Sequence, residues 1–312
     1  MHVLVTGATG FVGSHLVPAL RAADHDVRVL VRHPAGYDPA PGVEVATGDL
    51  LEPGSFDAAL EGVDAAYYLV HSMGAGDDYD ARDRRAARHF RAAASEAGVD
   101  RVVYLGGLGG DEAPLSTHLR SRRTVEHLLA AGAYDLTTLR AAIIVGAGSA
   151  SFQLICELAA RFPLLVTPRA VATDCHPIAI ADVVDYLVGV LETPATAGGT
   201  YEIGGPEVMS YADVLRRTGA RAGSGGLRIV PLPMLSPGLS SYWVGFLTDV
   251  PASVARPLVA GLDTPVVADD DSIRDLVPVD LTPFETAVDR ANAERCDDRA
   301  PRPTATDGGA GR

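Results

Sequence analysis

The amino-acid sequence predicts an α/β fold, a doubly wound parallel sheet with a smaller C-terminal lobe. Short apolar, β-rich runs alternate with helix-period segments through the first half of the 312 residues. Near-continuous apolar strands that alternate with helices are typical of a parallel sheet covered on both faces. A glycine-rich stretch, "VTGATGFVGSHL", directly follows the first apolar run. Such a stretch marks the tight strand-to-helix turn of a Rossmann-type fold.

Six runs in the first half are predicted to be strands, with helices in the intervals. The strands are expected at residues 2–7, 27–32, 43–49, 64–70, 101–107 and 136–144. Helical stretches include Ser55–Glu61 and Asp80–Ala97, and the second ends at Gly98, a suitable C-cap. Pro18 stands inside the first expected helix and should kink it or limit its first turns.

The glycines of the first turn have the spacing GxxGxxG. Gly7 permits the tight turn, Gly10 lets the backbone approach a pyrophosphate, and Gly13 lets the helix pack on the strand. The helix N-terminus presents free N–H groups to phosphate. Because the pattern stands in a strand–turn–helix context, it predicts a dinucleotide site rather than a glycine-rich turn without ligand. The residues expected there are Gly7, Thr9, Gly10, Phe11, Val12 and Gly13.

The pattern becomes looser after about residue 150 and predicts a different organisation. A helix is expected in "ASFQLICELAARF", a short strand and a helix in "PIAIADVVDYLVGVLE", and one more strand in "GTYEIGG". The predicted domains are a Rossmann domain over residues 1–150, to which 176–204 return, and a substrate lobe over 151–290. Residues 291–312 are too polar and too rich in Pro and Gly to bury a core and are expected to be disordered.

Composition limits the classes of function. Net charge is −14, all 26 basic residues are Arg, and the chain contains no Lys. Such a surface repels nucleic acid, and no apolar run is long enough to span a bilayer. The chain enters a strand at once, so no signal peptide is expected, and Cys156, Cys175 and Cys296 lack disulfide or metal spacing. We therefore expect a cytoplasmic protein without metal, and the carboxylate-rich, Lys-free composition resembles halophilic proteins.

Several segments together resemble the extended and atypical short-chain dehydrogenase/reductase superfamily, particularly NmrA-like proteins and the nucleotide-binding accessory subunit of respiratory complex I. The segments are "TGATGFVG", "GDL" (48–50), "YYLVHSMG" (67–74), "RVVYLGGLG" (101–109), "LRAAIIVG" (139–146) and "PIAIADVVDYL" (177–187). The resemblance covers residues 1–290 and implies an NAD(P)-binding protein.

The resemblance also implies roles for residues beyond the glycine turn. Asp49 would accept a hydrogen bond from the adenine amino group, and Leu50 would pack on the ring. Leu69, Val70 and His71 would line the nicotinamide-ribose side. A capping role for Asp49 and a structural hydrogen bond for His71 remain the alternatives.

The end of the second strand favours NADP(H) over NAD(H). Proteins that select NAD place an acid there to bind the ribose 2′-OH, but here Arg32 and His33 follow the strand. A guanidinium can hold a 2′-phosphate through two hydrogen bonds. The alternative for Arg32 is a solvated side chain at a strand end.

The resemblance places a substrate between the carboxyl ends of the strands and the C-terminal lobe. The candidate lining residues are Ser149, Phe152, His176, Tyr242 and Trp243. They are mostly apolar or aromatic, which favours a small apolar substrate such as a quinone, isoprenoid or enone. Each of them could equally be part of the core of the lobe.

The stretch "LSTHLRSRRTVEHLL" (115–129) departs from the superfamily. Its enzymes usually have a Tyr here and a Lys four residues later, whereas this chain has His118 and Arg122. The usual Ser falls at Gly106 or Gly107, so its hydroxyl is absent. His118 could donate a proton and Arg122 could hold the ribose. The alternative for His118 is a loop histidine that caps the next helix.

Two classes of function remain. The first is an NADP(H)-dependent oxidoreductase that lacks the Ser–Tyr–Lys triad and reduces a small apolar carbonyl, quinone or enone. The second is a nucleotide-binding protein without turnover, either a redox sensor or an accessory protein associated with a respiratory complex. A sugar-nucleotide epimerase is a weaker third, because that chemistry depends on the missing Tyr and Lys.

Overall fold

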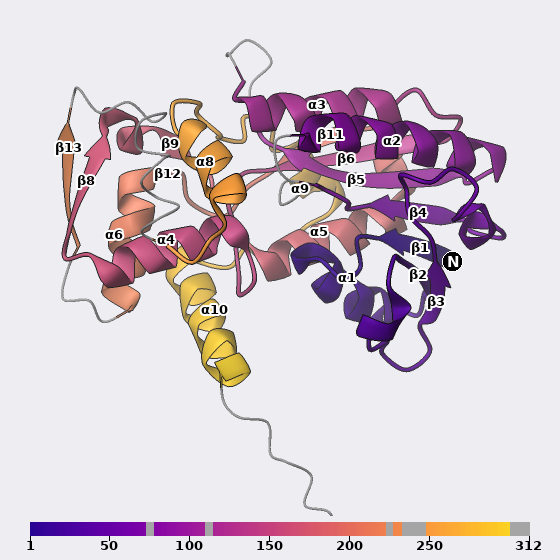
Figure 1. Ribbon diagram of the computed structural model, residues 1–312, viewed down its shortest axis with the longest axis horizontal. Helices are drawn as coiled ribbons and strands as arrows, with labels where there is room; N and C mark the ends of the chain where they lie inside the picture. The colour runs from indigo at the N-terminus through magenta and orange to yellow at the C-terminus, as the bar shows by residue number, and fades with distance from the viewer. Residues whose placement is uncertain (73–77, 110–114, 223–226, 233–247, 300–312) are drawn as a thin grey trace, which may run out of the picture.

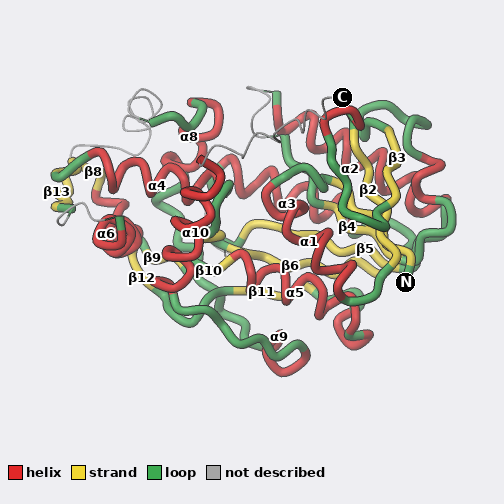
Figure 2. The backbone as a smooth tube through the Cα atoms, turned by 90° about the horizontal axis from the view of Figure 1, so that it is seen from below, coloured by secondary structure: helices red, strands yellow, loops and turns green. Residues whose placement is uncertain are grey.

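The computed structural model describes residues 1–72, 78–109, 115–222, 227–232 and 248–299. Figure 1 shows a layered α/β domain at one end of the molecule and a smaller lobe, with α4, α6 and α8, at the other. The same division is visible from a second direction in Figure 2.

A parallel seven-stranded sheet forms the centre of the larger domain. Its order is β11-β6-β5-β4-β1-β2-β3, and every neighbouring pair is parallel. The chain reverses its direction of winding between β1 and β4, which is where such folds bind ligands. The strands are β1 His2–Thr6, β2 Asp26–Val31, β3 Glu44–Thr47, β4 Ala65–Tyr68, β5 Arg101–Gly107, β6 Asp135–Ala141 and β11 Thr200–Ile203.

The six runs predicted as strands are all found in this sheet, and the predicted Rossmann-type α/β fold is confirmed. The run expected at 136–144 is divided, because β6 ends at Ala141 and a short strand, β7 Ile144–Val145, follows. The helix expected at Ser55–Glu61 is only a 3₁₀ turn. The 3₁₀ turns are η1 Pro34–Gly36, η2 Asp57–Leu60, η4 Arg169–Ala172 and η5 Pro194–Thr196.

Helices cover both faces of the sheet. On one face lie α1 Phe11–Ala22 and α5 Ile180–Glu192, and on the other lie α2 Tyr79–Glu96 and α3 Thr117–Leu129 (Figure 1). In β1, Val3 and Val5 join the core beneath α1 and α5, whereas Leu4 joins the core beneath α2 and α3. Since side chains alternate along a strand and both faces are covered, the strand sequence is apolar throughout.

Helix α1 continues through Pro18 instead of ending there. Proline cannot donate to the carbonyl of Ser14, four residues earlier. Both Pro18 and Ser14 lie on the exposed side of the helix, where water can bind the free carbonyl. The expected limit on the first helix is therefore not observed.

The smaller lobe is built around helices and short paired strands. Parallel strands β8 Leu164–Pro168 and β13 Arg228–Leu232 lie at its edge. Antiparallel β9 Asp174–Cys175 and β12 Met209–Ser210 connect it to the larger domain, where β7 pairs with β10 Ile178–Ala179. Its helices are α4 Ala150–Arg161, α6 Tyr211–Arg221, α8 Ala252–Ala260 and α10 Phe284–Arg299, whereas α9 Ser272–Leu276 packs on β11 of the larger domain.

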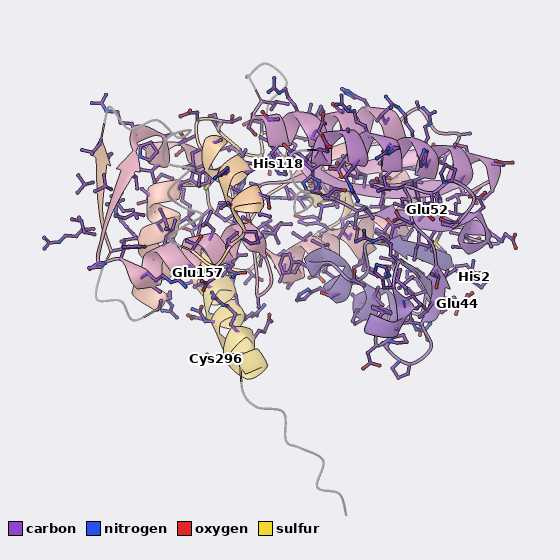
Figure 3. All side chains as sticks on the ribbon, in the orientation of Figure 1. His2, Glu44, Glu52, His118, Glu157 and Cys296 are labelled. Carbon is purple, nitrogen blue, oxygen red and sulfur yellow. The ribbon has the colours of Figure 1, made fainter. Side chains whose placement is uncertain are left out.

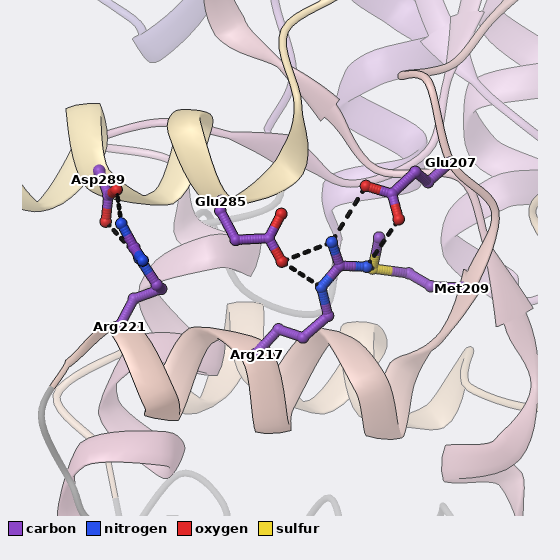
Figure 4. A network of polar contacts seen from close by, with 6 residues as sticks. All are labelled: Glu207, Met209, Arg217, Arg221, Glu285 and Asp289. Carbon is purple, nitrogen blue, oxygen red and sulfur yellow. Dashed lines mark hydrogen bonds and ion pairs between the residues drawn. The ribbon is translucent and has the colours of Figure 1, made fainter.

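Helix α10 extends to Arg299, nine residues into the segment expected to be disordered. Its buried Val288 and Ala291 belong to the core of the lobe. Arg217 of α6 bridges Glu207 and Glu285, at 2.9 and 2.5 Å, and Arg221 pairs with Asp289 (Figure 4). These contacts hold the first half of α10 against the lobe, and the helix then extends to Arg299.

A buried carboxylate joins α5 to the segment that leads into α10. Asp182 is 1% exposed, and its two oxygens accept hydrogen bonds from the backbone N–H and the hydroxyl of Thr282, at 2.8 and 2.7 Å. A buried carboxylate whose oxygens are both bonded contributes strongly to stability.

We predict that Asp182→Ala lowers the free energy of unfolding by about 2–3 kcal/mol, because both donors of Thr282 lose their charged acceptor. Asp185→Ala is the matched control, because Asp185 is exposed on the same helix. It should change stability by less than about 0.5 kcal/mol. Urea unfolding followed by circular dichroism measures both, and equal effects would contradict the assigned role of Asp182.

Candidate cofactor and substrate site

A cleft of about 440 Å³ opens at the carboxyl ends of β1, β2 and β4. This is the point at which the winding of the sheet reverses. Its walls are the glycine turn after β1, the ends of β2 and β3, the segment after β4, and the first turns of α2. It is lined by Thr6, Gly7, Thr9, Gly10, Leu30, Val31, Arg32, Gly48, Asp49, Leu50, Leu51, Leu69, Val70, His71, Ser72, Arg82 and Ala86.

The glycine turn has no room for side chains at two of its three glycines. Gly7 has φ +74°, and a Cβ there would lie 2.8 Å from the carbonyl oxygen of Leu69. A Cβ on Gly13 would lie 2.3 Å from the carbonyl oxygen of Gly7. A Cβ on Gly10 would meet only that same oxygen, at 3.2 Å, and otherwise open space. A pyrophosphate therefore fits against Gly10, beside the free N–H groups of the first turn of α1.

Nine of the thirteen residues predicted to bind the cofactor line this cleft. Among the other four, Phe11, Val12 and Gly13 form the first turn of α1, and His33 is exposed beside Arg32. The ring of Phe11 packs toward Gly146 and Gly148 instead of the cleft. Phe11 and Val12 can thus contribute backbone N–H groups, and their side chains support the helix.

Asp49 stabilises a turn and also lines the cleft. Its Oδ1 accepts a hydrogen bond from the N–H of Leu51, at 2.9 Å, which fixes the turn after β3. The residue also lines the cleft, beside the buried Leu50. Oδ2 has no partner among the described residues, so it can accept a hydrogen bond from an adenine amino group.

Two arginines line the cleft on the side of β2 and α2. Arg32 is exposed at the end of β2, with no ion pair to any residue in the described part of the chain. Arg82, on α2, was not predicted from the sequence, and its buried Nε also lacks a partner among the described residues. A helical Arg facing a cleft has no sequence signal, because α2 contains several other arginines that face solvent.

A second cavity, of about 270 Å³, lies between the larger domain and the lobe. Its lining is mainly apolar, and His71 belongs to both cavities. Figure 3 shows His118 at the start of α3, next to α8. The lining residues are His71, Leu105, Gly106, Gly107, Ser116, His118, Leu119, Arg122, Ala141, Ala142, Ile143, Ile144, Ala150, Ser151, Tyr211, Pro257, Leu258, Gly261 and Val266.

Three of the predicted substrate residues, Ser149, Phe152 and His176, do not belong to this lining. Ser149 is buried and caps α4, and Phe152 is part of the core of the lobe. His176 is also buried, with Nε2 2.8 Å from the carbonyl oxygen of Gly205 and Nδ1 accepting the N–H of Ala268 at 3.3 Å. Their neighbours Ala150 and Ser151 line the cavity instead. Tyr242 and Trp243 lie outside the described residues.

His118 and Arg122 both face the second cavity from α3. One guanidinium nitrogen of Arg122 donates to the carbonyl oxygen of Leu105 at 2.8 Å, and the group lies over the ring of Tyr104. Burial, together with the charge of Arg122, lowers the pKa of His118 to about 3. His118 is therefore neutral near pH 7 and rarely carries the proton that it would have to donate, which weakens the role inferred from its sequence position.

His71, unlike His118, is in hydrogen-bond contact with a carboxylate. Its Nδ1 is 2.6 Å from Oδ2 of the buried Asp83, and Oδ1 of Asp83 accepts the N–H of Ser72 at 2.8 Å. The rings of His71 and His118 lie 5.1 Å apart. Burial raises the pKa of Asp83, but the hydrogen bond and charge of His71 and the bonds from Ser72 outweigh it, so the pKa is lowered.

The position of the usual Ser is filled by packing. A Cβ on Gly107 would lie 2.7 Å from the side chain of Leu119, and one on Gly106 would lie 3.2 Å from the ring of Tyr104. Neither position has space for a hydroxyl-bearing side chain without movement of these neighbours. Ser116, which caps α3 by accepting the N–H of Leu119, supplies a hydroxyl to the cavity from another direction.

The described ranges contain neither a membrane-spanning helix nor a metal-ligand cluster. No helix there has the length and hydropathy needed to cross a membrane. The same residues contain no cluster of three or more His, Cys, Asp or Glu side chains suited to a metal ion.

The parallel sheet, the glycine turn and the cleft at the reversal point define a dinucleotide-binding α/β protein. Residues 7–144 match a family described as NAD(P)H-binding. A ceramide reductase of Caulobacter vibrioides is 30% identical over 288 residues, which cover 90% of this chain and 86% of the relative. The chain belongs to the extended short-chain dehydrogenase/reductase superfamily of NAD(P)-binding proteins, as the sequence segments predicted.

Other similarities are shorter or concern the fold alone. An NAD(P)H azoreductase of Xenophilus azovorans is 38% identical over 109 residues, 34% of this chain and 36% of that protein. A nucleoside-diphosphate-sugar epimerase of Staphylococcus aureus superposes with a TM-score of 0.72 at 16% identity, covering 92% and 99% of the two chains. A UDP-glucose 4-epimerase of Thermotoga maritima gives 0.72 at 14% identity, with 95% and 99% covered.

We predict that Gly10→Val abolishes dinucleotide binding and leaves the fold largely intact, because the new side chain occupies space otherwise open to the pyrophosphate. Gly13→Val is the contrasting variant. Its side chain would meet the backbone of Gly7 and Ala8 and should destabilise the protein itself. Fluorescence titration with NADPH and thermal unfolding separate the two effects. Near-native NADPH affinity in Gly10→Val would show that the phosphate lies elsewhere.

Proposed function

We propose that the protein is an NADP(H)-dependent oxidoreductase that reduces a small, mainly apolar carbonyl, quinone or enone. The observation that carries this proposal is that the two cavities have His71 in common. A dinucleotide in the first cavity and an acceptor in the second would meet there. A protein that only sensed or stored a nucleotide would have no need of the second cavity.

The chemistry of the second cavity supports an apolar acceptor. Its walls are mostly Leu, Ile, Ala, Val and Gly, and the charged group facing it, Arg122, is already engaged by the backbone of β5. The cavity is slightly smaller than the usual range for sites that hold drug-sized molecules, about 300–1,000 Å³. It therefore fits a compact reactive group better than a sugar diphosphate.

The residues of the cleft fit the nicotinamide cofactor. Gly7 and Gly10 admit the pyrophosphate, Asp49 and Leu50 form the adenine end, and Leu69 and His71 form the end near the second cavity. When bound, the cofactor supplies the hydride. The chain's contribution is to position the acceptor, exclude water with apolar walls, and move a proton.

The relatives support reduction over epimerisation. The ceramide reductase and the azoreductase carry names of reducing enzymes, and the first is similar over nearly the whole chain. The likeness to the two epimerases described above is at the level of the fold. Epimerase chemistry would need the Tyr and Lys that His118 and Arg122 replace. None of the relatives described above is named as a respiratory subunit.

The preference for NADP(H) is argued from the two arginines. Arg32 stands at the end of β2, where an acid would bind the 2′-OH of NAD, and no ion pair within the described residues engages it. Arg82 lines the same cleft from α2, with its Nε unpartnered. A guanidinium can form two charge-assisted hydrogen bonds with a phosphate.

We predict that the protein binds NADPH more tightly than NADH and that Arg32→Ala removes most of this preference. Loss of a charge-assisted contact should weaken NADPH binding about tenfold or more and leave NADH binding little changed. Arg85→Ala, an exposed change on α2, is the control. Fluorescence titrations measure the dissociation constants of the three proteins for both cofactors. Equal affinities for the two cofactors, or an unaltered preference in Arg32→Ala, would refute the assignment.

We predict that quinones and conjugated enones oxidise NADPH in the presence of the protein, and that NADP is not reduced by simple secondary alcohols. Activated acceptors need less help from an acid, and the cavity lacks the Ser–Tyr–Lys set. A panel of acceptors followed at the absorbance of NADPH tests this. If NADPH binds and no acceptor is reduced, the nucleotide-binding protein without turnover becomes the better description. Robust alcohol oxidation would contradict the proposed chemistry.

A further inference from the structure

One side chain lies where the two cavities meet and has a nitrogen with no partner. Nε2 of His71 is buried and forms no hydrogen bond with any residue that the structure describes. His71 lines both cavities, whereas His118 and Arg122 line only the second and Asp49 only the first. A buried nitrogen without a partner carries an energetic cost unless a ligand or a proton satisfies it.

The other nitrogen of the ring fixes how His71 carries its proton. Asp83 is buried, and both of its oxygens are engaged, one by Nδ1 of His71 and one by the N–H of Ser72. An ionised carboxylate can only accept hydrogen bonds, so Nδ1 of His71 must hold the hydrogen. In the neutral ring, Nε2 therefore has a free lone pair and points its proton-binding site away from Asp83.

We propose that His71, held by Asp83, is the proton-transferring residue of the site and takes the role of the superfamily's Tyr. That Tyr would lie on α3, whereas His71 follows β4 and Asp83 belongs to α2. This inference rests on the proposed reductase function. It assigns Asp83 as a positioning residue, because Asp83 acts only through His71 and lines neither cavity.

The proton and electrons balance in a single step. Bound NADPH would supply a hydride to the carbonyl carbon and would be left as NADP. The C=O π bond breaks, and its electron pair moves to oxygen. That oxygen takes the proton from Nε2 of doubly protonated His71, whose N–H bond breaks. The ring is left neutral, with Nδ1–H still bonded to Asp83, and regains its proton from solvent. For an enone, the hydride adds to the β-carbon, and the enolate oxygen takes the proton.

The groups around His71 set the pH at which it works. From α2 it faces Asp83, Tyr79 and Arg82, and from α3 it faces His118 and Arg122. Burial lowers the pKa of His71 below its ordinary value of 6.5. The hydrogen bond to Asp83 opposes this, and Arg122 adds to it. Because reduction needs the protonated ring, the rate should rise as pH falls through a value below 6.5.

The first test observes the ring directly and needs no turnover. ¹⁵N NMR of the histidine-labelled protein at pH 7 should show His71 with a protonated Nδ1 and an unprotonated Nε2. In Asp83→Asn the amide oxygen can still accept the N–H of Ser72, but its NH₂ group then faces Nδ1. The tautomer should therefore reverse, with the proton on Nε2. A neutral wild-type ring whose single proton is on Nε2 would overturn the proposal.

The second test uses the best enone or carbonyl acceptor from the panel. His71→Asn should lower kcat/KM by about 10²- to 10⁴-fold and abolish the rise of kcat/KM at low pH, which is the acidic limb of the profile. Asp83→Asn should also lower kcat/KM and should move the acidic limb to lower pH, because the carboxylate that raises the pKa of His71 is lost. NADPH binding, measured by fluorescence, shows whether each variant retains the cleft. His127→Gln, an exposed change on α3, is the control and should match the wild type in rate and profile.

The outcomes separate this inference from the proposed function. If the wild type reduces no acceptor, the proposed function fails, and the NMR experiment still decides whether His71 is held as described. If the wild type turns over and His71→Asn keeps the acidic limb, the inference fails and the function stands. Loss of the limb in His118→Phe, with retention in His71→Asn, would assign the proton to His118 instead.

Discussion

The close contact between the first strand and the first helix is the constraint on which the rest of the structure depends. A single Cβ on Gly13 would lie 2.3 Å from the carbonyl oxygen of Gly7, so α1 can pack this tightly only on glycine. The same turn lies against the carbonyl of Leu69, which brings the segment after β4 to the edge of the cleft. The segment places His71 where the cleft ends and the second cavity begins. One steric condition thus brings the residue that the two cavities share to the point where they meet.

The sequence predicted the central sheet well because its strands are covered on both faces. Val3, Leu4 and Val5 are each fully buried although they point to opposite sides, so the apolar run is visible without any knowledge of the fold. The strands of the lobe carry no such signal. Leu164 and Val166 of β8 are 52% and 48% exposed, and their partner strand β13 lies far along the chain. A two-stranded edge with one open face has no burial pattern for a sequence to reveal.

The two parts of the site, the glycine turn and the pair of His71 with Asp83, also differed in how far the sequence could predict them. The glycine turn could be predicted because all its conditions lie within a few consecutive residues. The pairing of His71 with Asp83 could not, because Asp83 belongs to an otherwise polar helix, α2, in which acids are expected to face solvent. Only the packing of α2 on the sheet turns this carboxylate inward, to 2% exposure. His118 was found from its sequence position. Its burial and the nearby charge of Arg122, which together lower its pKa and keep it unprotonated near pH 7, are properties of the fold.

The groups that face the second cavity together determine which acceptors can be reduced there. Leu119 fills the space of the missing Ser, and Arg122 is bonded to the carbonyl of Leu105, so neither polarises a carbonyl strongly. Proton transfer then depends on imidazoles that burial keeps mainly neutral at pH 7. A simple ketone would develop an alkoxide with little stabilisation. A quinone or enone delocalises the same charge over its own conjugated system, so hydride transfer to it does not require simultaneous proton transfer. The apolar walls and the scarcity of acids in the cavity therefore favour the same class of acceptor.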